Sequence, residues 1–337
     1  MAFSWDKLEK PILALAPMSG YTDSAYRRLI KSICPSVICF TEFTSADGLK
    51  YESKNTLKQL DFSPLEERPL IAQIFGKKPE NFAIAARHIK ELGFDAIDIN
   101  MGCPAKKVVS SDHGSALLAH PDLALRLVES AVQASGLPVS VKMRVGIKEV
   151  NMNFLVKFCS DLESAGASLL TLHGRTAKQM YTGTADWEPI YEVKKHVHIP
   201  VLGNGDIRSA DDAKKRLGNL DGIMVGRATI GNPWLMAEIA AAFSGASFTA
   251  PTSFPDKVPY FIRHAELCVE TKGEEIGMKE MRKHFVWLLR GFENASLYRA
   301  EVVKISTLKE AKKILYDLAD KLKNANPVET PQNTREV

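Results

Sequence analysis

Eight short apolar runs, separated by amphipathic segments, are the feature that most restricts how this chain can fold. Each run is bounded by Gly, Pro or polar residues, and most of the segments between them end in Gly or a similar helix stop. Near-continuous apolar strands that alternate with helices indicate a parallel sheet covered on both faces. The eight runs are residues 11–17, 36–40, 69–76, 95–100, 138–146, 167–174, 200–206 and 221–228.

The number of runs, and the length of chain that holds them, decide between two α/β architectures. Eight strand–helix units in about 240 residues match a (β/α)8 barrel. A doubly wound open sheet competes with it, but no G-x-G-x-x-G motif follows the first run. We therefore predict a (β/α)8 TIM barrel over residues 1–243, followed by a small all-helical domain.

The segment after the barrel differs in composition. Residues 244–255 are rich in Ser, Thr, Gly and Pro and predict a linker. Residues 256–323 contain no strand-like run and predict the helical domain, while residues 324–337 predict a disordered tail. Between residues 255 and 324 there are 14 Lys and Arg and 11 Asp and Glu, so this region holds three of the chain's four net positive charges.

Composition excludes several classes of protein. No apolar run approaches the roughly 20 residues that span a bilayer, and the N-terminus lacks the pattern of a signal peptide. Five widely spaced cysteines without a C-x-x-C pair argue against a disulfide framework or a structural zinc site. A net charge of +4 permits a polyanionic partner without requiring one. We expect a cytoplasmic protein with no membrane partner and no metal.

Polar residues gather at the carboxyl ends of the eight predicted strands, where barrels of this kind carry their catalytic groups. One such residue alone is a weak signal, but their coincidence at one rim predicts an active site. In strand order they are Pro17, Met18 and Ser19; Glu42; Gln73; Asn100 and Cys103; Lys142 and Arg144; His173 and Arg175; Asn204 and Asp206; and Gly226 and Arg227.

Two of these residues stand out by their position. Cys103 lies beyond its strand between Gly102 and Pro104, whereas we interpret the other four cysteines as small buried hydrophobes. Lys142 interrupts an apolar strand, which costs free energy unless its charge is paired or used. It is therefore either a Schiff-base lysine or an anion-binding lysine. His173 by itself is as often a satisfied core histidine as a functional one.

The Gly-rich turns after the seventh and eighth strands predict a phosphate site. In such barrels the backbone N–H groups of these turns and the helix N-termini that follow face an anion. A phosphate site together with Lys142, His173 and Gln73 suits flavin mononucleotide (FMN). Lys142 would then lie near the N1/O2 side of the flavin ring and stabilise its anionic reduced form, and Gln73 would bond the ring's polar edge.

The cysteine completes a chemical hypothesis. An unperturbed thiol is largely protonated at neutral pH, so Cys103 can act as a general acid. A hydride donor on one face and a proton donor on the other are what the saturation of a polarised C=C bond requires.

Seven motifs closely resemble those of the tRNA-dihydrouridine synthases, in order and over essentially the whole chain. They are APMSGYTD, NMGCPAKK, GSALL, VKMRVG, LHGRT, NGDI and MVGRATIGNPW, and the stretch MRKHFVWLLRG resembles part of the helical C-terminal domain of a bacterial subfamily. The resemblance implies an FMN-dependent oxidoreductase that reduces the C5=C6 bond of a D-loop uridine in tRNA to 5,6-dihydrouridine. It implies FMN contacts from Pro17, Met18, Ser19, Gln73, Lys142, His173, Asn204, Gly205, Asp206, Gly226 and Arg227.

The resemblance also assigns the remaining roles. Cys103 would protonate uridine C5 while reduced flavin delivers hydride to C6, and NADPH or NADH would re-reduce the flavin. Because uridine is stacked within folded tRNA, the enzyme must extrude it into the barrel mouth, at a cost of a few kcal/mol. We expect contacts to the RNA from Asn100, Lys106, Lys107, Arg144 and Arg175 of the barrel and from Lys279, Arg282, Lys283 and Arg290 of the helical domain.

Three other functions remain open at this point. A flavin barrel that acts on a free pyrimidine, as dihydroorotate-type dehydrogenases do, shares the chemistry but needs no basic helical domain. A Schiff-base lyase that uses Lys142 would bind no flavin, and a non-catalytic RNA-binding protein would not need Cys103. On the favoured hypothesis, tRNA is the partner, DNA is not, and the enzyme is a monomer.

Overall fold

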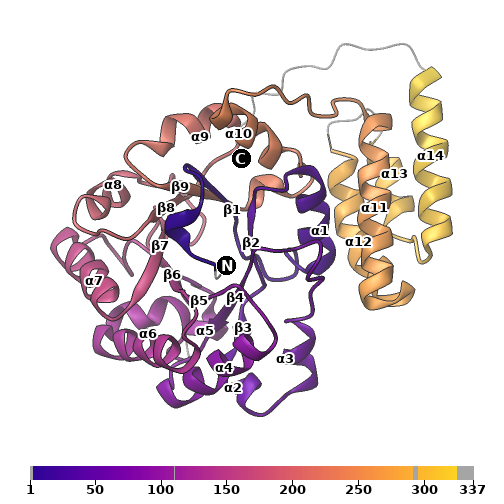
Figure 1. The fold of residues 1–337 in the computed structure, drawn as a ribbon. Coiled ribbons are helices and arrows are strands. Elements are labelled where there is room, and N and C mark those ends of the chain that lie inside the picture. Colours follow the sequence, from indigo (N-terminus) through magenta and orange to yellow (C-terminus); the bar gives the residue numbers. More distant parts are fainter. Residues whose placement is uncertain (1–2, 110, 291–294, 325–337) are drawn as a thin grey trace. The chain divides into compact units, whose positions relative to one another are not determined.

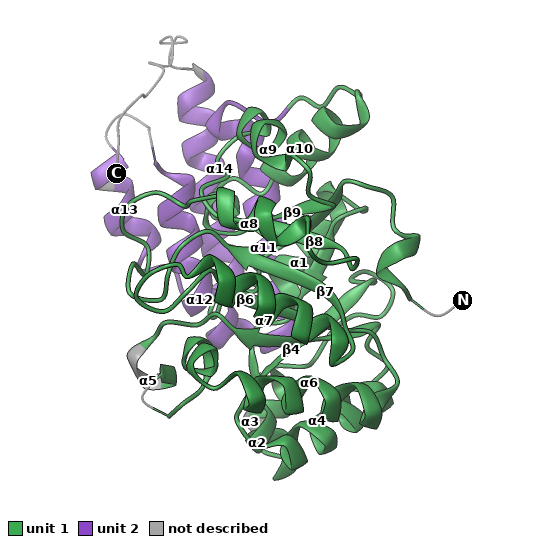
Figure 2. Ribbon diagram, turned by 90° about the vertical axis from the view of Figure 1, so that its left-hand side faces the viewer, with its two compact units in different colours: residues 1–249 green, residues 250–337 purple. Residues whose placement is uncertain are grey.

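The computed structural model describes residues 3–109, 111–290 and 295–324. The chain divides into two compact units, residues 1–249 and residues 250–337, coloured separately in Figure 2. The predicted disordered tail lies outside the described residues from position 325 onward, and Asn324 ends the last helix. Each unit is described below by itself.

The first unit is a closed barrel of parallel strands, with helices around it (Figure 1). Each strand pairs with its neighbours in parallel, and the pairing of β2 with β4 closes the ring. All eight apolar runs form its strands, so the predicted TIM barrel is confirmed and the open sheet is excluded. The strands are β1 Ile12–Leu15, β2 Ile38–Phe40, β4 Leu70–Phe75, β5 Ala96–Met101, β6 Val139–Arg144, β7 Ala167–His173, β8 Val201–Asn204 and β9 Gly222–Val225.

A two-residue strand that the sequence did not predict, β3 Thr44–Ser45, extends the sheet beside β4. The helices of this unit follow the strands. They are α1 Ser24–Ile33, α2 Ala46–Lys50, α3 Lys54–Lys58, α4 Pro79–Glu91, α5 Lys106–Val109, α6 Pro121–Ser135, α7 Met152–Ser164, α8 Glu188–Lys194, α9 Ala210–Leu217 and α10 Leu235–Ser244, with 3-10 turns η1 Trp5–Lys7, η2 Gly114–Ala119 and η3 Arg227–Thr229.

Local sequence signals explain where these helices begin and end. Asp23 and Ser209 cap the first turns of α1 and α9 by accepting backbone N–H groups at positions 26 and 212. Helix α6 begins with Pro121 and ends at Gly136, whose φ of +64° suits a glycine C-cap. The ends of these helices are therefore encoded locally.

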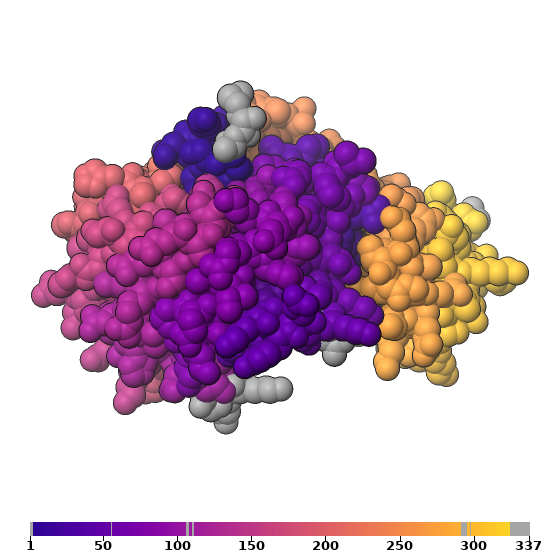
Figure 3. Space-filling view, turned by 60° about the horizontal axis from the view of Figure 1, so that its bottom comes forward, coloured from indigo at the N-terminus to yellow at the C-terminus, as the bar shows by residue number. Residues whose placement is uncertain are grey.

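The N-terminal end of the barrel is filled by Trp5, which is 1% exposed. Its ring packs with residues near the beginnings of the strands, among them Ile12, Ile38 and Ala96, and it stacks on Phe40 with a centroid distance of 6.3 Å. The N-terminal segment crosses in front of the strands in Figure 1 and stands at one end of the barrel, in indigo, in Figure 3. The Trp5 cluster is apolar, and the predicted site residues follow the opposite ends of the strands.

The second unit consists of helices. They are α11 Phe254–Lys272, α12 Glu274–Leu288, α13 Ala295–Val302 and α14 Leu308–Asn324. Helix α11 packs against both α12 and α14, and apolar residues such as Phe261, Met281 and Phe285 are buried between them. Helix α11 begins after its cap Ser253, two residues earlier than the predicted linker would end. Within the described residues, no helix is both long and apolar enough to cross a bilayer.

Candidate active site

Polar side chains line the barrel interior toward the carboxyl ends of the strands, in stacked rows. Side chains two residues apart in a strand share a face, and Ile71, Ala96 and Leu169 face the interior with Trp5. The residues two and four positions further along the same strands therefore also face inward. Strand pairing places them in three levels: Gln73, Asp98 and Ser140; then Asn100, Lys142 and Thr171; then Arg144, His173 and Asn204.

Cys103 lies just beyond β5 and is partly exposed. Its backbone N–H donates to Asn100 Oδ1 at 3.0 Å, and its carbonyl accepts the N–H of Ser115 at 3.1 Å. The other four cysteines are buried as predicted, and burial raises the pKa of Cys39 to about 12. Cys103 is thus the cysteine that the structure holds at the open end of the barrel.

Lys142 and His173, which lie in these rows, have pKa values well below the ordinary ones. Lys142 is partly buried and donates to Asn204 Oδ1 at 3.1 Å, and burial lowers its pKa to about 8 against the opposing charge of Asp98. Burial, followed by the positive charges of Lys142 and three arginines, lowers the pKa of His173 to about 2. His173 is therefore neutral at physiological pH, and Lys142 keeps most of its charge there but loses its proton more easily than an exposed lysine.

Arg144 links the Cys103 loop to the loop after β7. Its Nε donates to the Gly102 carbonyl at 3.0 Å, and its Nη1 donates to the carbonyls of Thr176 and Met180 at 2.8 and 2.9 Å. The side chain is 2% exposed, so its position is fixed by these bonds.

Tyr181, which the sequence analysis missed, follows directly in this loop. Its ring is 54% exposed and lies beneath two guanidinium groups, that of Arg227 at 4.6 Å and that of Arg144 at 5.7 Å from its centroid. An exposed aromatic ring held by cations at a barrel mouth is a surface on which a flat ligand can stack. The signal in the sequence was a lone tyrosine a few residues after LHGRT.

The turns after β8 and β9 form a cradle of backbone donors. Within the described residues, the N–H groups of Gly205, Asp206, Gly226 and Arg227 donate to no other group. Gly205 has a φ of +134°, and a Cβ there would lie 2.6 Å from the Ala185 Cβ, so only glycine fits. Four unused donors on two adjacent turns suit a phosphate group.

Asp206 forms a buried ion pair with Arg175. The guanidinium makes two bonds to the carboxylate, and the N–H of Ala185 adds a third at 2.7 Å. Arg175 is 2% exposed and also donates to the carbonyls of Thr182 and Gly183. Its predicted contact with RNA stays a prediction; in the structure its donors go to the protein.

The loop after β1 carries Pro17, Met18 and Ser19. It approaches the β9 turn, because a Cβ on Gly226 would lie 3.5 Å from the Met18 sulfur. Glu42, at the end of the second predicted strand, accepts the N–H of Gly20 in this loop. The three predicted contact residues thus lie beside the phosphate cradle.

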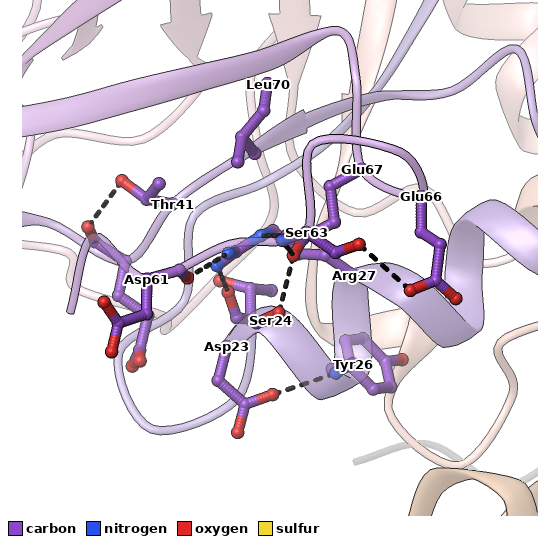
Figure 4. Close-up of polar contacts among 12 residues, drawn as sticks. Asp23, Ser24, Tyr26, Arg27, Thr41, Asp61, Ser63, Glu66, Glu67 and Leu70 are labelled. Atoms are coloured by element: carbon purple, nitrogen blue, oxygen red, sulfur yellow. Dashed lines mark hydrogen bonds and ion pairs between the residues drawn. The ribbon is translucent and has the colours of Figure 1, made fainter. Parts of the chain in front are cut away.

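A buried ion pair behind this loop was not predicted (Figure 4). Arg27 and Glu67 are 1% and 0% exposed and meet at 2.6 Å, and Glu67 also accepts the hydroxyl of Ser24. Arg27 donates to the Thr22 carbonyl at 2.7 Å, and the Thr22 hydroxyl accepts the N–H of Met18 at 2.8 Å. The pair therefore fixes the first strand's loop from residues 40 positions apart in the sequence.

The residues expected to contact RNA stay predictions, and the structure shows where they lie. Lys106 and Lys107 belong to α5, but their side chains lie outside the described residues. In the helical unit, Lys279 is exposed, and Arg290 follows α12 with its guanidinium 3.3 Å from the ring centroid of Trp287. Lys283 is partly exposed, and Arg282 donates to the Ile305 carbonyl at 2.9 Å.

Two solved structures with a TM-score above 0.5 resemble the barrel. A complex of 2-naphthoyl-CoA reductase aligns with a TM-score of 0.54 at 12% identity, over 69% of this chain and 50% of that chain. A 6-hydroxypseudooxynicotine amine oxidase from Pseudomonas geniculata aligns with a TM-score of 0.51 at 16% identity, over 69% of this chain and 47% of that one. At these identities the likeness shows a shared fold.

Sequence relatives give a narrower result. The chain is 37% identical over 303 residues to a probable tRNA-dihydrouridine synthase 1 from Synechocystis sp., covering 89% of this chain and 84% of the relative. It is 37% identical over 317 residues to a probable tRNA-dihydrouridine synthase from Mycobacterium tuberculosis, covering 90% and 81%. The family model for dihydrouridine synthase (Dus) matches residues 14–326. This chain therefore belongs to the dihydrouridine synthase family.

Proposed function

We propose that the protein is a flavin-dependent tRNA-dihydrouridine synthase that reduces the C5=C6 bond of a D-loop uridine in tRNA. The observation that carries the proposal is the placement of Cys103 at the open barrel end, with its backbone tied to Asn100 and with Lys142 and Arg144 on the next strand. Membership of the family supports the same reaction.

The residues present fit FMN. The four unused N–H groups of the β8 and β9 turns suit its phosphate. The Thr171 hydroxyl is buried in the same row as Lys142 and has no partner among the described residues, so it too can receive a ligand group. The predicted contacts divide between Gln73, Lys142 and His173 for the ring, the first-strand loop beside it, and residues 204–206 and 226–227 for the phosphate.

A bound flavin, reduced by NADPH or NADH, supplies the hydride that C6 of uridine receives. The chain's own residues supply the remaining requirements. Cys103 provides a proton to C5 from a loop whose backbone is bonded on both sides. Lys142 contributes positive charge that favours an anionic ring, and neutral His173 can accept or donate a hydrogen bond without adding charge.

Substrate recognition is divided between the mouth and the helical unit. We assign the mouth contacts with the uracil ring to Asn100, Arg144 and Tyr181, because all three lie around the Cys103 loop. Exposed cations, such as Lys279 and Arg290 of the helical unit, would contact RNA phosphates, as Lys106 and Lys107 of the barrel would. Five free cysteines suit a reducing cytoplasm, and we propose that the enzyme acts there as a monomer.

Flavin reoxidation under anaerobic conditions tests the proposal. The purified protein is loaded with FMN, bleached with NADPH, and mixed with tRNA transcribed without modifications. Return of the yellow colour with tRNA, and not with free uridine or orotate, is the expected result. Reoxidation only by a free pyrimidine would indicate a free-pyrimidine reductase, and failure to bind flavin would contradict the site itself. Trapping of a substrate adduct on Lys142 by borohydride would indicate a lyase.

A further inference from the structure

Asp98 is a carboxylate in the barrel interior to which the sequence analysis gave no role. It is 0% exposed, and a buried carboxylate is unfavourable unless hydrogen bonds and charge compensate for the lost water. It accepts the Gln73 Nε2 and the Ser140 hydroxyl, each at 2.6 Å. Burial raises its pKa to about 7 against these two bonds and the charge of Lys142.

A hydrogen-bond chain leads from Asp98 to the cysteine loop. Gln73 donates to Asp98 through Nε2 and accepts the Asn100 Nδ2 through Oε1 at 3.0 Å. Asn100 in turn accepts through Oδ1 the N–H groups of Gly102 at 3.1 Å and Cys103 at 3.0 Å. Gln73 is 0% exposed and Asn100 is 8% exposed, so water has little access to either amide.

The two ends of this chain fix the direction of every bond in it. At a pH above its raised pKa the Asp98 carboxylate is ionised and only accepts, and backbone N–H groups only donate. Gln73 must therefore turn its NH2 group toward Asp98, which leaves its oxygen for Asn100. Asn100 must turn its NH2 group toward Gln73, which leaves its oxygen for the cysteine loop. Reversing either amide would set donor against donor or acceptor against acceptor in a buried place.

We propose that Asp98 is a positioning residue that sets the orientation of Gln73 and Asn100 and thereby fixes the backbone from which the Cys103 thiol projects. The importance of that thiol rests on the proposed function. The series of hydrogen bonds from Asp98 to Cys103 consists only of this protein's own groups, so it can be tested without flavin, nicotinamide or RNA.

The alkylation rate of Cys103 by iodoacetamide, followed by mass spectrometry on the folded protein, is the measurement. Asp98→Ala and Asn100→Ala should each speed the reaction at least fivefold, because the loop loses the bonds that hold its N–H groups and keeps only those to its carbonyls. In the Asn100→Ala background, adding Asp98→Ala should change the rate by less than twofold, since the connection is already broken. Fivefold effects that multiply in the double variant would overturn the proposal.

Three further variants separate positioning from packing. Asp98→Asn should keep a rate within twofold of the original, because its amide can donate to Ser140 and its oxygen can still accept from Gln73. Asp98→Leu fills the volume without an acceptor and should behave like Asp98→Ala. Ser140→Ala removes a hydrogen bond to the Asp98 carboxylate that does not lead toward Cys103. It should therefore change the alkylation rate less than twofold. If Asp98→Leu matches the original protein, volume alone is what matters and the proposal fails.

Turnover gives a second readout. If the proposed function holds, Asp98→Ala should lower kcat for tRNA at least tenfold with a smaller change in KM, and Asp98→Asn should restore most of it. Should the original protein not reduce tRNA, the proposed function fails, but the alkylation experiment still decides the role of Asp98. If Asp98→Ala does not fold, the Asp98→Leu and Asp98→Asn pair carries the same comparison.

Discussion

The two terminal nitrogens of the Arg175 guanidinium donate to the two carboxylate oxygens of Asp206, at 2.9 and 2.8 Å, across 31 positions of sequence. Burial alone would raise the pKa of Asp206, but the hydrogen bonds from Arg175 and Ala185 and the charge of Arg175 hold it below its usual range. The pair supports the turn whose N–H groups form the phosphate cradle.

Removing this support should affect both stability and cofactor binding. Arg175→Met leaves the Asp206 carboxylate with only the Ala185 N–H and the Arg227 guanidinium at 3.5 Å, which costs about 3 kcal/mol of unfolding free energy. Because the folded pKa of Asp206 is lowered, the pair stabilises above the carboxyl's ordinary pKa of 3.8 and loses this effect as the pH falls below it. Urea unfolding at pH 7 and FMN titration measure the two losses. Arg175→Lys, which keeps the charge but not the paired bonds, should recover only part of either; full recovery would mean that charge alone suffices.

Cys103→Ala should separate flavin chemistry from uridine reduction. The variant should bind FMN and oxidise NADPH with an artificial electron acceptor as before, while its reduction of tRNA falls about 10² to 10⁴ fold through loss of the general acid. Mass spectrometry of the tRNA product measures the second activity. Cys34→Ala, at the buried cysteine that caps the C-terminus of α1, controls for the loss of a thiol. Retained activity on tRNA in Cys103→Ala would remove the acid assignment.

Lys142 should destabilise the flavin-free protein and strengthen the binding of FMN. Its folded pKa of about 8 lies below the ordinary 10.5, so the unfolded chain binds its proton more tightly and stability rises with pH between these values. Lys142→Met should therefore stabilise the flavin-free protein at pH 7 by about 3 kcal/mol, with the difference shrinking toward pH 10.5.

The same variant should weaken FMN binding at least tenfold. Thermal melts across this pH range and FMN fluorescence titrations measure the two effects. Lys148→Met, at an exposed lysine of the loop after β6, controls for the loss of one positive charge. Equal melting temperatures for Lys142→Met and the original protein at pH 7 would contradict the stated burial cost.

Tyr181 should contribute to substrate binding by its ring. Stacking of a base on an aromatic side chain is worth about 1 to 3 kcal/mol, so Tyr181→Ala should lower kcat/KM for tRNA about 5 to 150 fold. FMN affinity should stay within threefold. Tyr181→Phe keeps the ring and should stay close to the original enzyme, and steady-state kinetics with unmodified tRNA distinguish the two variants. A Tyr181→Phe defect as large as that of Tyr181→Ala would instead point to the hydroxyl.

The basic side chains Lys279, in α12, and Arg290, just after it, should bind RNA through phosphates. A Lys279→Ala, Arg290→Ala double variant should weaken tRNA binding and reduce the slope of log K against log salt by about one to two. NADPH oxidation should not change. Filter binding at several salt concentrations measures the slope, with Lys313→Ala on α14, a lysine paired with Asp317, as the matched control. An unchanged slope would assign these residues to a solvated helix face.

The barrel was predictable because its strands are continuous apolar runs with clear ends, and each run became a strand. The residues at the strand ends were predictable for the same reason, since topology brings them to one rim. The helical domain was predictable from the lack of strand-like runs, and helix α13 Ala295–Val302 lies within it. The ion pair of Arg27 and Glu67 was not predictable, because neither residue's neighbours in sequence indicate its partner.

The sequence predicted which residues lie at the rim of the barrel more readily than it predicted what each of them does there. Arg175 is the type of residue expected to contact a phosphate or RNA. In the structure, however, its N–H groups donate to Asp206 and to neighbouring carbonyls. Asp98 looks like a strand residue that alternates with Ile97 and Ile99, and only the paired strands on either side show what it bonds. Which way a polar side chain turns depends on partners that the sequence does not place.

The indole of Trp5 also has a kinetic meaning. Because it fills the N-terminal end of the barrel, the opposite end, where Cys103 lies, is the entrance to the polar rows. On the proposed function, a nicotinamide and a uridine would have to reach the same ring through that entrance, and neither could approach while the other is in place. The reaction would then proceed as two half-reactions in alternation, and the dinucleotide would leave before the nucleic acid enters. A tryptophan at the far end of the barrel would thereby impose the order of events at the catalytic end.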